Sequence, residues 1–267
     1  MRIKALFQRL REQKRPALVG YITAGDPSPD RTADLVAALE RGGVDLIELG
    51  VPFSDPIADG PVIQSASERA LNAGTTVARV LEIAEQIRSR SEIPLILFSY
   101  LNPILRFGLE ALGREAKRCG VDGCLLTDLS VEEADQTVTA MRATGLDTVF
   151  LASPTSPQRR MELVAKYSTG FVYLVSRTGV TGERQNIESS LETLVRDMRK
   201  VTDTPLVVGF GISTPEQAAE AGRLADGVAV GSAIVRLVEQ NQHSPDLERK
   251  LEEYARSLST ALHGVAA

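Results

Sequence analysis

The residues best suited to move protons in this chain are carboxylates in and after one short apolar segment. Glu48 lies in the run 44–49, where the period of two puts it on the same face as Leu46. Partial loss of hydration there would raise its pKa toward the range useful in acid–base catalysis. The position also suits a structural Glu paired with a Lys or Arg from another loop. Further on, Asp59 lies in a proline-containing loop, and spacing alone does not favour it over Asp55.

Histidine chemistry is excluded by where the histidines lie. The two in the chain, His243 and His263, come after every segment that we interpret as a barrel strand. A Ser-His-Asp triad, a Cys-His pair or a histidine-rich metal site therefore cannot be assembled. The two cysteines, Cys119 and Cys124, give no disulfide framework and are interpreted as small buried residues. Acid–base chemistry would depend on carboxylates or tyrosines.

Two glycine-containing segments suggest an anion site. Gly209-Phe-Gly-Ile-Ser213 and Gly231-Ser-Ala-Ile234 each follow an apolar run. Glycine lets the backbone approach an anion, and a helix beginning at Ser232 or Thr214 would offer unpaired N–H groups and the positive end of its dipole. Together the two loops favour phosphate binding, although ordinary strand-to-helix turns contain the same residues. A dinucleotide fingerprint is excluded, because Thr214 replaces its third glycine.

A third loop has the composition of a lid. Ser176-Arg-Thr-Gly-Val-Thr-Gly-Glu-Arg184 combines two glycines with small hydroxylated residues. Such a segment could close over a site and exclude water. A flexible surface loop would have the same composition, and the sequence does not separate the two.

Short apolar runs alternate with helical patterns along the chain. This alternation indicates a parallel sheet covered by helices. Eight such units favour closure into a (β/α)8 barrel, the TIM-barrel form of the α/β class, in which active sites lie at the C-terminal ends of the strands. The expected strands are 17–23, 44–49, 93–98, 121–126, 147–151, 170–175, 205–208 and 226–230.

Several helical segments are expected beyond the eight repeats. Residues 1–15 form an amphipathic pattern before the first strand. Extra helix-length sequence follows the second strand at 61–89 and the third at 103–113, and a terminal helix is expected from Ser244 to about Ala261. No Pro/Gly-rich linker interrupts the pattern, so we expect 1–267 to form a single barrel domain.

Charge and hydropathy exclude two classes of partner. The formal net charge of −5 argues against nucleic acid, which demands a basic surface. No apolar run of about 18 residues is present, so no membrane span is expected. The N-terminal segment is rich in Lys and Arg and lacks the apolar centre of a signal peptide, which predicts a cytoplasmic protein.

Several segments, taken together and in order, resemble the tryptophan synthase α subunit family. The most specific is Glu48-Leu-Gly-Val-Pro-Phe-Ser-Asp-Pro-Ile-Ala-Asp-Gly-Pro61, continued by Ile63-Gln64 and Ala66-Ser-Glu-Arg-Ala70. The resemblance covers about 17–240. The other matching segments are Tyr21-Ile-Thr-Ala-Gly-Asp-Pro27, Ser99-Tyr-Leu-Asn-Pro103, Tyr173-Leu-Val-Ser-Arg-Thr-Gly-Val-Thr-Gly182, Gly209-Phe-Gly-Ile-Ser213 and Gly227-Val-Ala-Val-Gly-Ser232.

The resemblance implies a role for each matching residue. By similarity, Glu48 is the acid–base catalyst and Asp59 faces the indole N–H. Phosphate binding is implied for Gly182, Phe210, Gly211, Gly231 and Ser232. The indole pocket and lid are implied to contain Tyr21, Phe98, Tyr100, Tyr173 and Thr181, and the surface facing a β subunit to contain Pro52 and Asp55.

The implied activity is a carbon–carbon lyase step of tryptophan biosynthesis. Indole-3-glycerol phosphate would undergo retro-aldol cleavage to indole and glyceraldehyde 3-phosphate. Two carboxylates suffice for this chemistry, so the resemblance implies no metal, Schiff-base lysine or organic cofactor in this subunit. Pyridoxal phosphate is expected in the β partner, with which the chain would form an α2β2 complex.

The sequence departs from the family pattern at two places and leaves alternative functions open. Ser130 stands where many relatives carry Pro, and the 152–154 segment shifts a proline by one position; both are expected beside the indole pocket. A stand-alone lyase on the same scaffold is one alternative. A non-catalytic regulatory subunit is another, against which Glu48 and Asp59 argue. A different phosphosugar barrel, such as an isomerase, would leave the 48–61 segment unexplained.

Overall fold

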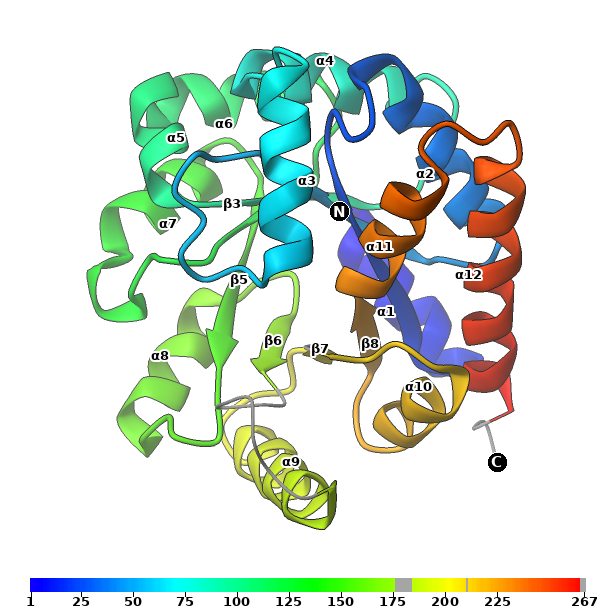
Figure 1. The fold of residues 1–267 in the computed structure, drawn as a ribbon. Coiled ribbons are helices and arrows are strands. Elements are labelled where there is room, and N and C mark those ends of the chain that lie inside the picture. Colours follow the sequence, from blue (N-terminus) through cyan, green and yellow to red (C-terminus); the bar gives the residue numbers. More distant parts are fainter. Residues whose placement is uncertain (176–183, 210, 265–267) are drawn as a thin grey trace.

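Eight parallel strands close into a barrel in which β1 pairs with β8 (Figure 1). The structure is a computed structural model that describes residues 1–175, 184–209 and 211–264, without the side chains of 184–189. The predicted (β/α)8 class is confirmed. The strands are β1 (Ala17–Thr23), β2 (Leu46–Gly50), β3 (Leu95–Ser99), β4 (Gly123–Leu126), β5 (Asp147–Ala152), β6 (Val172–Val175), β7 (Leu206–Gly209) and β8 (Gly227–Val230).

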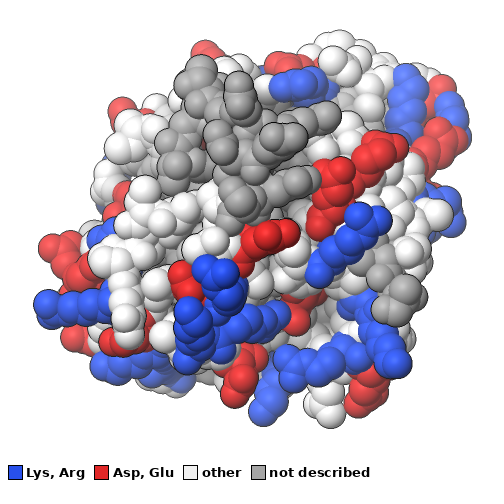
Figure 2. Space-filling view, turned by 90° about the horizontal axis from the view of Figure 1, so that it is seen from below, with Lys and Arg blue, Asp and Glu red and all other residues white. Residues whose placement is uncertain are grey.

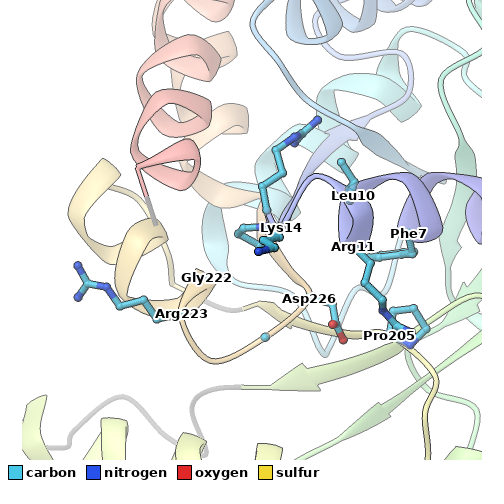
Figure 3. A pocket seen from close by; sticks show the side chains of 11 residues that line it. Phe7, Leu10, Arg11, Lys14, Pro205, Gly222, Arg223 and Asp226 are labelled. Carbon is cyan, nitrogen blue, oxygen red and sulfur yellow. The ribbon is translucent and has the colours of Figure 1, made fainter. Parts of the chain in front are cut away.

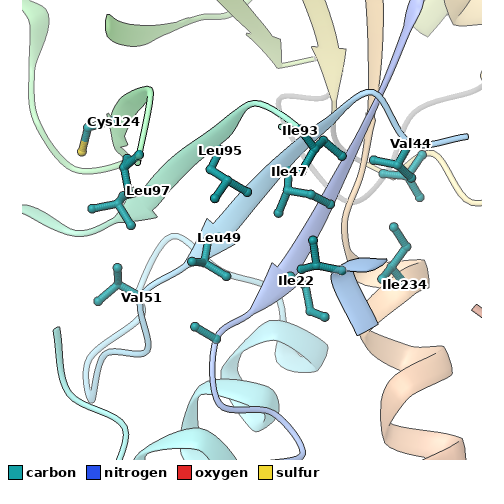
Figure 4. Close-up of a cluster of buried hydrophobic side chains, with 14 of the residues drawn as sticks. Ile22, Val44, Ile47, Leu49, Val51, Ile93, Leu95, Leu97, Cys124 and Ile234 are labelled. Atoms are coloured by element: carbon teal, nitrogen blue, oxygen red, sulfur yellow. The ribbon is translucent and has the colours of Figure 1, made fainter. Parts of the chain in front are cut away.

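Alternating strand residues divide the core into an inner and an outer part. Ile47 and Leu49 of β2 point outward into the layer between sheet and helices, where Figure 4 shows them beside residues of the neighbouring strands. Leu46, which precedes Ile47, belongs to the cluster that fills the barrel. The period of two puts Glu48 on the same face as Leu46, as the sequence predicted, and that face is the inner one.

The N-terminal helix closes the bottom of the barrel. Helix α1 (Arg2–Glu12) buries Ile3, Leu6, Phe7 and Leu10, which recur at helical spacing and belong to the inner cluster. The ring of Phe7 lies 6.1 Å from that of Phe171, measured between centroids. With the N-terminal end of the barrel filled in this way, the open end is the one where the strands terminate.

The predicted additional helices are present. Helix α3 follows β2 before α4, and α5 follows β3 before α6. A further helix that the sequence analysis did not count as additional, α11, follows β8 before the terminal α12. The helices that follow α1 in the described residues, including those just named, are η1 (Pro29–Arg31), α2 (Thr32–Arg41), α3 (Pro61–Asn72), α4 (Val77–Arg88), α5 (Leu101–Phe107), α6 (Leu109–Arg118), η2 (Val131–Glu133), α7 (Asp135–Ala143), α8 (Gln158–Tyr167), α9 (Arg184–Arg199), α10 (Pro215–Gly222), α11 (Ser232–Asn241) and α12 (Leu247–His263).

The surface mixes charges of both signs. On the face shown in Figure 2, Lys and Arg side chains lie interspersed with Asp and Glu. Among the described helices, none is both long and apolar enough to cross a membrane. Cys119 and Cys124 are both buried and free, as expected.

Candidate active site

A cavity opens at the C-terminal ends of the barrel strands. Its volume is about 170 Å³, comparable to an engineered cavity of about 150 Å³ that admits benzene, and it suits a compact aromatic ring. Residues from four strands and three loops converge there. The lining consists of Tyr21, Glu48, Ala58, Asp59, Gly60, Ile63, Phe98, Tyr173, Gly211, Gly231 and Ser232.

Glu48 is the most deeply buried carboxylate of this cavity, with 1% of the residue exposed. Its Oε1 atom has no hydrogen-bond partner among the described residues. Loss of hydration raises the pKa of Glu48 to about 8. The alternative of a structural Glu paired with a lysine or arginine finds no support, since no salt bridge of Glu48 occurs within the described residues. The carboxyl group is thus buried without compensation at the point where a substrate would lie.

Asp59 is held in place by Tyr100. The Tyr100 hydroxyl donates to Asp59 Oδ2 at 3.1 Å and accepts from the backbone N–H of Ala58 at 2.9 Å. Burial raises the pKa of Asp59 to about 6, while the hydrogen bond from Tyr100 opposes that rise. The ring of Tyr100 also packs on Phe53, with centroids 5.2 Å apart. One tyrosine therefore fixes the loop after β2, and Tyr100 acts on Asp59 rather than lining the cavity itself.

The aromatic wall of the cavity comes from three strands. Tyr21 meets Phe98 edge to face, with ring centroids 5.2 Å apart, and Tyr173 lines the opposite part from β6. The Tyr21 hydroxyl lies 3.3 Å from Thr23 Oγ1. The Tyr21 side chain passes over Gly50, and a Cβ added at Gly50 would lie 2.2 Å from the Tyr21 hydroxyl oxygen. Only glycine at that position leaves room for the phenol.

The helix N-terminus that the structure favours for an anion is that of α11. The helix has no side-chain cap, and Gly231 and Ser232 at its start line the cavity, so the N–H groups of its first turn are available to an anion bound there. Helix α10 differs, because Thr214 and Gln217 form a capping box that already satisfies its first N–H groups. Gly211 reaches the cavity with φ +84°, a conformation that glycine adopts readily. The choice between Ser232 and Thr214 therefore falls on Ser232.

Some predicted site residues lie outside the described residues. They are Phe210, Thr181, Gly182 and most of the expected lid at 177–186. Their assignments stay predictions.

The expected partner-facing residues differ in exposure. Asp55 is exposed, and Ser54 donates to its Oδ2 at 2.5 Å, whereas Pro52 is buried in this chain. Two exposed apolar side chains were missed by the sequence analysis: Ile57 is 87% exposed in the same loop, and Leu105 is 52% exposed on α5. The sequence could have indicated Ile57, since it is an apolar residue within a polar, proline-rich loop.

The departures from the family pattern do not reach the cavity. Neither Ser130 nor the 152–154 segment belongs to its lining, and the Ser130 hydroxyl donates to Glu132 at 2.5 Å. Their expected place beside the indole pocket stays a prediction. Ile63, by contrast, was not predicted as a lining residue; it reaches the cavity from the first turn of α3.

A larger cavity, of about 440 Å³, lies at the opposite end of the barrel (Figure 3). It is formed by the end of α1 and the segments that precede β1, β7 and β8. Its carboxylate, Asp226, is already engaged by Arg199 and by the backbone N–H of Leu206 at 2.7 Å. This cavity is larger than the one beside Glu48, but barrel chemistry occurs at the other end, where Glu48 Oε1 has no hydrogen-bond partner among the described residues. No group of three metal-ligating side chains occurs in the described parts of the chain.

Fold and cavity together define the chain as a (β/α)8-barrel enzyme whose open end carries two carboxylates with raised pKa values. The family model "Tryptophan synthase alpha chain" matches residues 7–263. The chain belongs to the tryptophan synthase alpha chain family.

Individual relatives agree with this assignment. The tryptophan synthase alpha chain of Solibacter usitatus is 64% identical over 96% of both chains, and that of Geobacter sulfurreducens is 48% identical over 98% of both. The crystal structure of tryptophan synthase subunit alpha from Legionella pneumophila superposes with a TM-score of 0.91 at 37% identity, covering 98% of each chain. A chain of Mycobacterium tuberculosis tryptophan synthase, in an aminoacrylate-bound form, gives 0.88 at 33%, covering 98% of this chain and 99% of that one.

Family membership fixes the reaction. The chain is a lyase of tryptophan biosynthesis that cleaves indole-3-glycerol phosphate to indole and glyceraldehyde 3-phosphate. The alpha chain family uses no cofactor of its own, and pyridoxal phosphate belongs to the β subunit. These findings overturn the alternatives of a non-catalytic subunit and of an isomerase.

Proposed function

We propose that Glu48 both donates and accepts the protons of the cleavage. A pKa of about 8 keeps this carboxyl group largely protonated at neutral pH in the empty site. It can therefore act first as an acid. Having lost its proton it becomes a carboxylate, and the same group can then act as a base.

The chemistry requires those two transfers in that order. Protonation of the indole ring at C3 converts it to an indoleninium, which is the electron sink that the cleavage needs. Removal of the proton from the adjacent hydroxyl then forms the aldehyde as the bond between C3 and the glycerol chain breaks, and its electrons return to the ring. The proton lost by Glu48 is replaced by the hydroxyl proton, so one carboxyl group completes the cycle.

Asp59 has the complementary role in this proposal. With a pKa of about 6, its side chain is largely ionised at neutral pH, and the Tyr100 hydroxyl supports the carboxylate form. A carboxylate facing the indole N1–H stabilises the positive charge that develops on the ring after protonation at C3. Two carboxyl groups in one cavity thus have different protonation states, which is the arrangement that separate acid and anion roles require.

The phosphate of the substrate is proposed to bind at the N-terminus of α11. The unpaired N–H groups beside Gly231 and Ser232 and the positive end of the helix dipole favour a dianion there. Gly211 allows close approach of the backbone from the loop after β7. Phe210 and Gly182 join this assignment by resemblance alone.

The observation that carries the proposal is that a buried oxygen of Glu48, at the edge of the cavity, finds no hydrogen-bond partner in the part of the chain that the structure describes. Its test is indole release by the Glu48→Gln variant in a single turnover. We expect a loss of at least ~10²-fold, within the ~10²–10⁴-fold range of general acid–base catalysis. Binding of glycerol 3-phosphate should persist, which shows that the site is intact. Near-normal indole release would remove Glu48 from the mechanism.

We infer that the chain docks a tryptophan synthase β subunit through the loop after β2. Exposed Ile57 adjoins Ala58, whose N–H is held by Tyr100, and Asp59 follows at once. A single exposed apolar side chain is common on protein surfaces, so the inference rests on the position of Ile57 beside Asp59 and on the family resemblance. Pressure from a partner on Ile57 would therefore be transmitted to Asp59, coupling assembly to activity. Asp55 lies exposed in the same loop.

The proposed assembly is an α2β2 complex with a pyridoxal-phosphate β dimer, formed from a chain that is largely monomeric alone. Titration of a β subunit, followed by mass and by indole release, tests it. Both should rise together. If mass rises without activity, the coupling is wrong; if neither changes, the stand-alone lyase is the better interpretation. That 1–267 act as one domain in the cytoplasm also stays a prediction.

A further inference from the structure

Two helices bring both ends of the proposed substrate site together. Helix α3 begins at Pro61, directly after Asp59 and Gly60, and α11 begins at Ser232. Residues from the first turn of each line the same cavity. The helices lie next to each other at the front of the barrel in Figure 1 and pack against one another. Both therefore lead away from the cavity, one from its indole end and the other from its phosphate end.

One side chain joins the far ends of these helices. Arg69, in the last turn of α3, donates from Nη1 to Glu239 Oε1 of α11 at 2.7 Å. It lies about 12 Å along α3 from Pro61, and Glu239 lies about 10 Å along α11 from Ser232. The stretches of α3 and α11 between the cavity and this ion pair are therefore of nearly equal length. A change in the distance between the two helices at the ion pair would change the distance between their first turns at the cavity.

The same guanidinium is anchored to the barrel. Its Nε and Nη2 atoms donate to the two oxygens of Asp26 at 2.8 and 3.0 Å. Asp26 is buried and follows β1, where its own N–H donates to the carbonyl of Thr23 at 3.2 Å. Burial raises the pKa of Asp26, and Arg69 opposes that rise. A planar guanidinium can hold both oxygens of Asp26 and still reach Glu239, whereas a lysine ammonium cannot.

We propose that Arg69 is a positioning residue for the cleavage reaction, one that fixes the distance between Asp59 and the phosphate-binding end of α11. The inference rests on the proposed indole and phosphate ends of the site. Its consequence concerns the whole substrate, whose two ends must fit both positions at once. The affinity of a ligand that occupies one end of the site alone does not depend on the distance between the two ends.

The discriminating variant is Glu239→Gln. The Glu239 side chain is 38% exposed, so its ion pair adds little to folding stability. We expect the KM for indole-3-glycerol phosphate to rise about 3- to 5-fold, the upper range for such a pair. The dissociation constants of glycerol 3-phosphate and of indole, each measured alone, should change less than about 2-fold, and the melting temperature should be retained. Arg69→Lys should raise the KM further, since it also weakens the hold on Asp26.

A matched control separates positioning from general loss of an ion pair. Glu85→Gln removes an interhelical pair of similar length but greater exposure, Arg118 Nη1 to Glu85 Oε1 at 2.8 Å, which joins α6 and α4 away from the cavity. It should leave the KM unchanged. An unchanged KM in Glu239→Gln, an equal rise in Glu85→Gln, or an equal weakening of glycerol 3-phosphate alone would each overturn the role of Arg69.

The proposed phosphate end is tested separately from Arg69. Gly211→Asp should weaken glycerol 3-phosphate binding in an otherwise unaltered chain. If it does not, the phosphate assignment fails and the inference falls with it. If it does, and Glu239→Gln leaves the KM unchanged, only the role of Arg69 is wrong.

Discussion

Replacing Glu48 by Gln should change how stability depends on pH, independently of any effect on catalysis. The carboxyl group has an ordinary pKa of 4.5 when unfolded and a pKa of about 8 in the folded barrel, where burial disfavours its charge. Between these values the folded state binds one proton more than the unfolded state, so stability falls as pH rises. Each pH unit corresponds to ~1.4 kcal/mol. From pH 5 to pH 8 the contribution of Glu48 should decrease by about 3.5 kcal/mol, a little less than three full pH units because the group is partly titrated at both ends of the range.

Glutamine is uncharged throughout this range and nearly the same shape. The difference in unfolding free energy between Glu48→Gln and the wild type should therefore grow in favour of the variant from pH 5 to pH 8. Urea unfolding at both pH values gives this difference directly. Glu92→Gln is the control: Arg2 lowers the pKa of Glu92, so its contribution is lost only at acid pH. A wild-type-to-variant difference for Glu48 that stays constant from pH 5 to pH 8 would refute the reasoning.

The remaining predictions concern the ends of the site and its partner surface. Gly211→Asp should weaken glycerol 3-phosphate binding by at least ~10-fold, because it places a negative charge beside a bound dianion, while Gly211→Ala should weaken it less. Equal affinities of wild type and Gly211→Asp, measured by calorimetry, would show that the phosphate binds elsewhere. The pH profile of kcat/KM should fall below about 6 and above about 8, because Asp59 must be ionised and Glu48 protonated. Tyr100→Phe should shift the acid-side fall of this kcat/KM profile to higher pH, because Asp59 loses a hydrogen bond that stabilises its carboxylate. An unchanged acid-side fall would show that Tyr100 does not support the Asp59 carboxylate. Ile57→Asp should weaken association with a β subunit by ~10-fold or more, measured by titration, without altering cleavage by the lone chain.

The barrel was predictable because eight apolar runs alternate with helical patterns along the chain. On β2, alternation put Glu48 on the face of Leu46 and Ile47 on the other face, and the structure places Leu46 in the inner cluster and Ile47 in the outer one. Strand ends shifted by one or two residues: β2 runs to Gly50, whereas the predicted run ended at 49. Helix α11 was visible as a helix start at Ser232, but nothing in the local pattern distinguishes an additional helix from the eighth barrel helix. That distinction depends on how α12 packs on α2, a contact distant in sequence.

Site residues were predictable from the sequence where their role depends on their own position in a strand or motif, and not where it depends on a contact between distant segments. The sequence did not choose between Asp55 and Asp59, and the family resemblance did; the structure agrees by placing Asp59 in the cavity and Asp55 in solvent. It did not indicate that Tyr100 would bridge Ala58 and Asp59, since that contact joins two separate loops. Arg69 was noticed only as part of a motif, because its two carboxylate partners lie far from it in the chain.

The most direct measurement of the central claim is the formation of indole from indole-3-glycerol phosphate by the wild type and Glu48→Gln, each with and without a β subunit. The wild type should release indole and glyceraldehyde 3-phosphate in equal amounts, faster when the β subunit is present. Glu48→Gln should be slower by at least ~10²-fold in both conditions while still binding glycerol 3-phosphate. Wild-type protein that forms no indole even with the β subunit, or a Glu48→Gln variant that keeps the wild-type rate, would contradict the account.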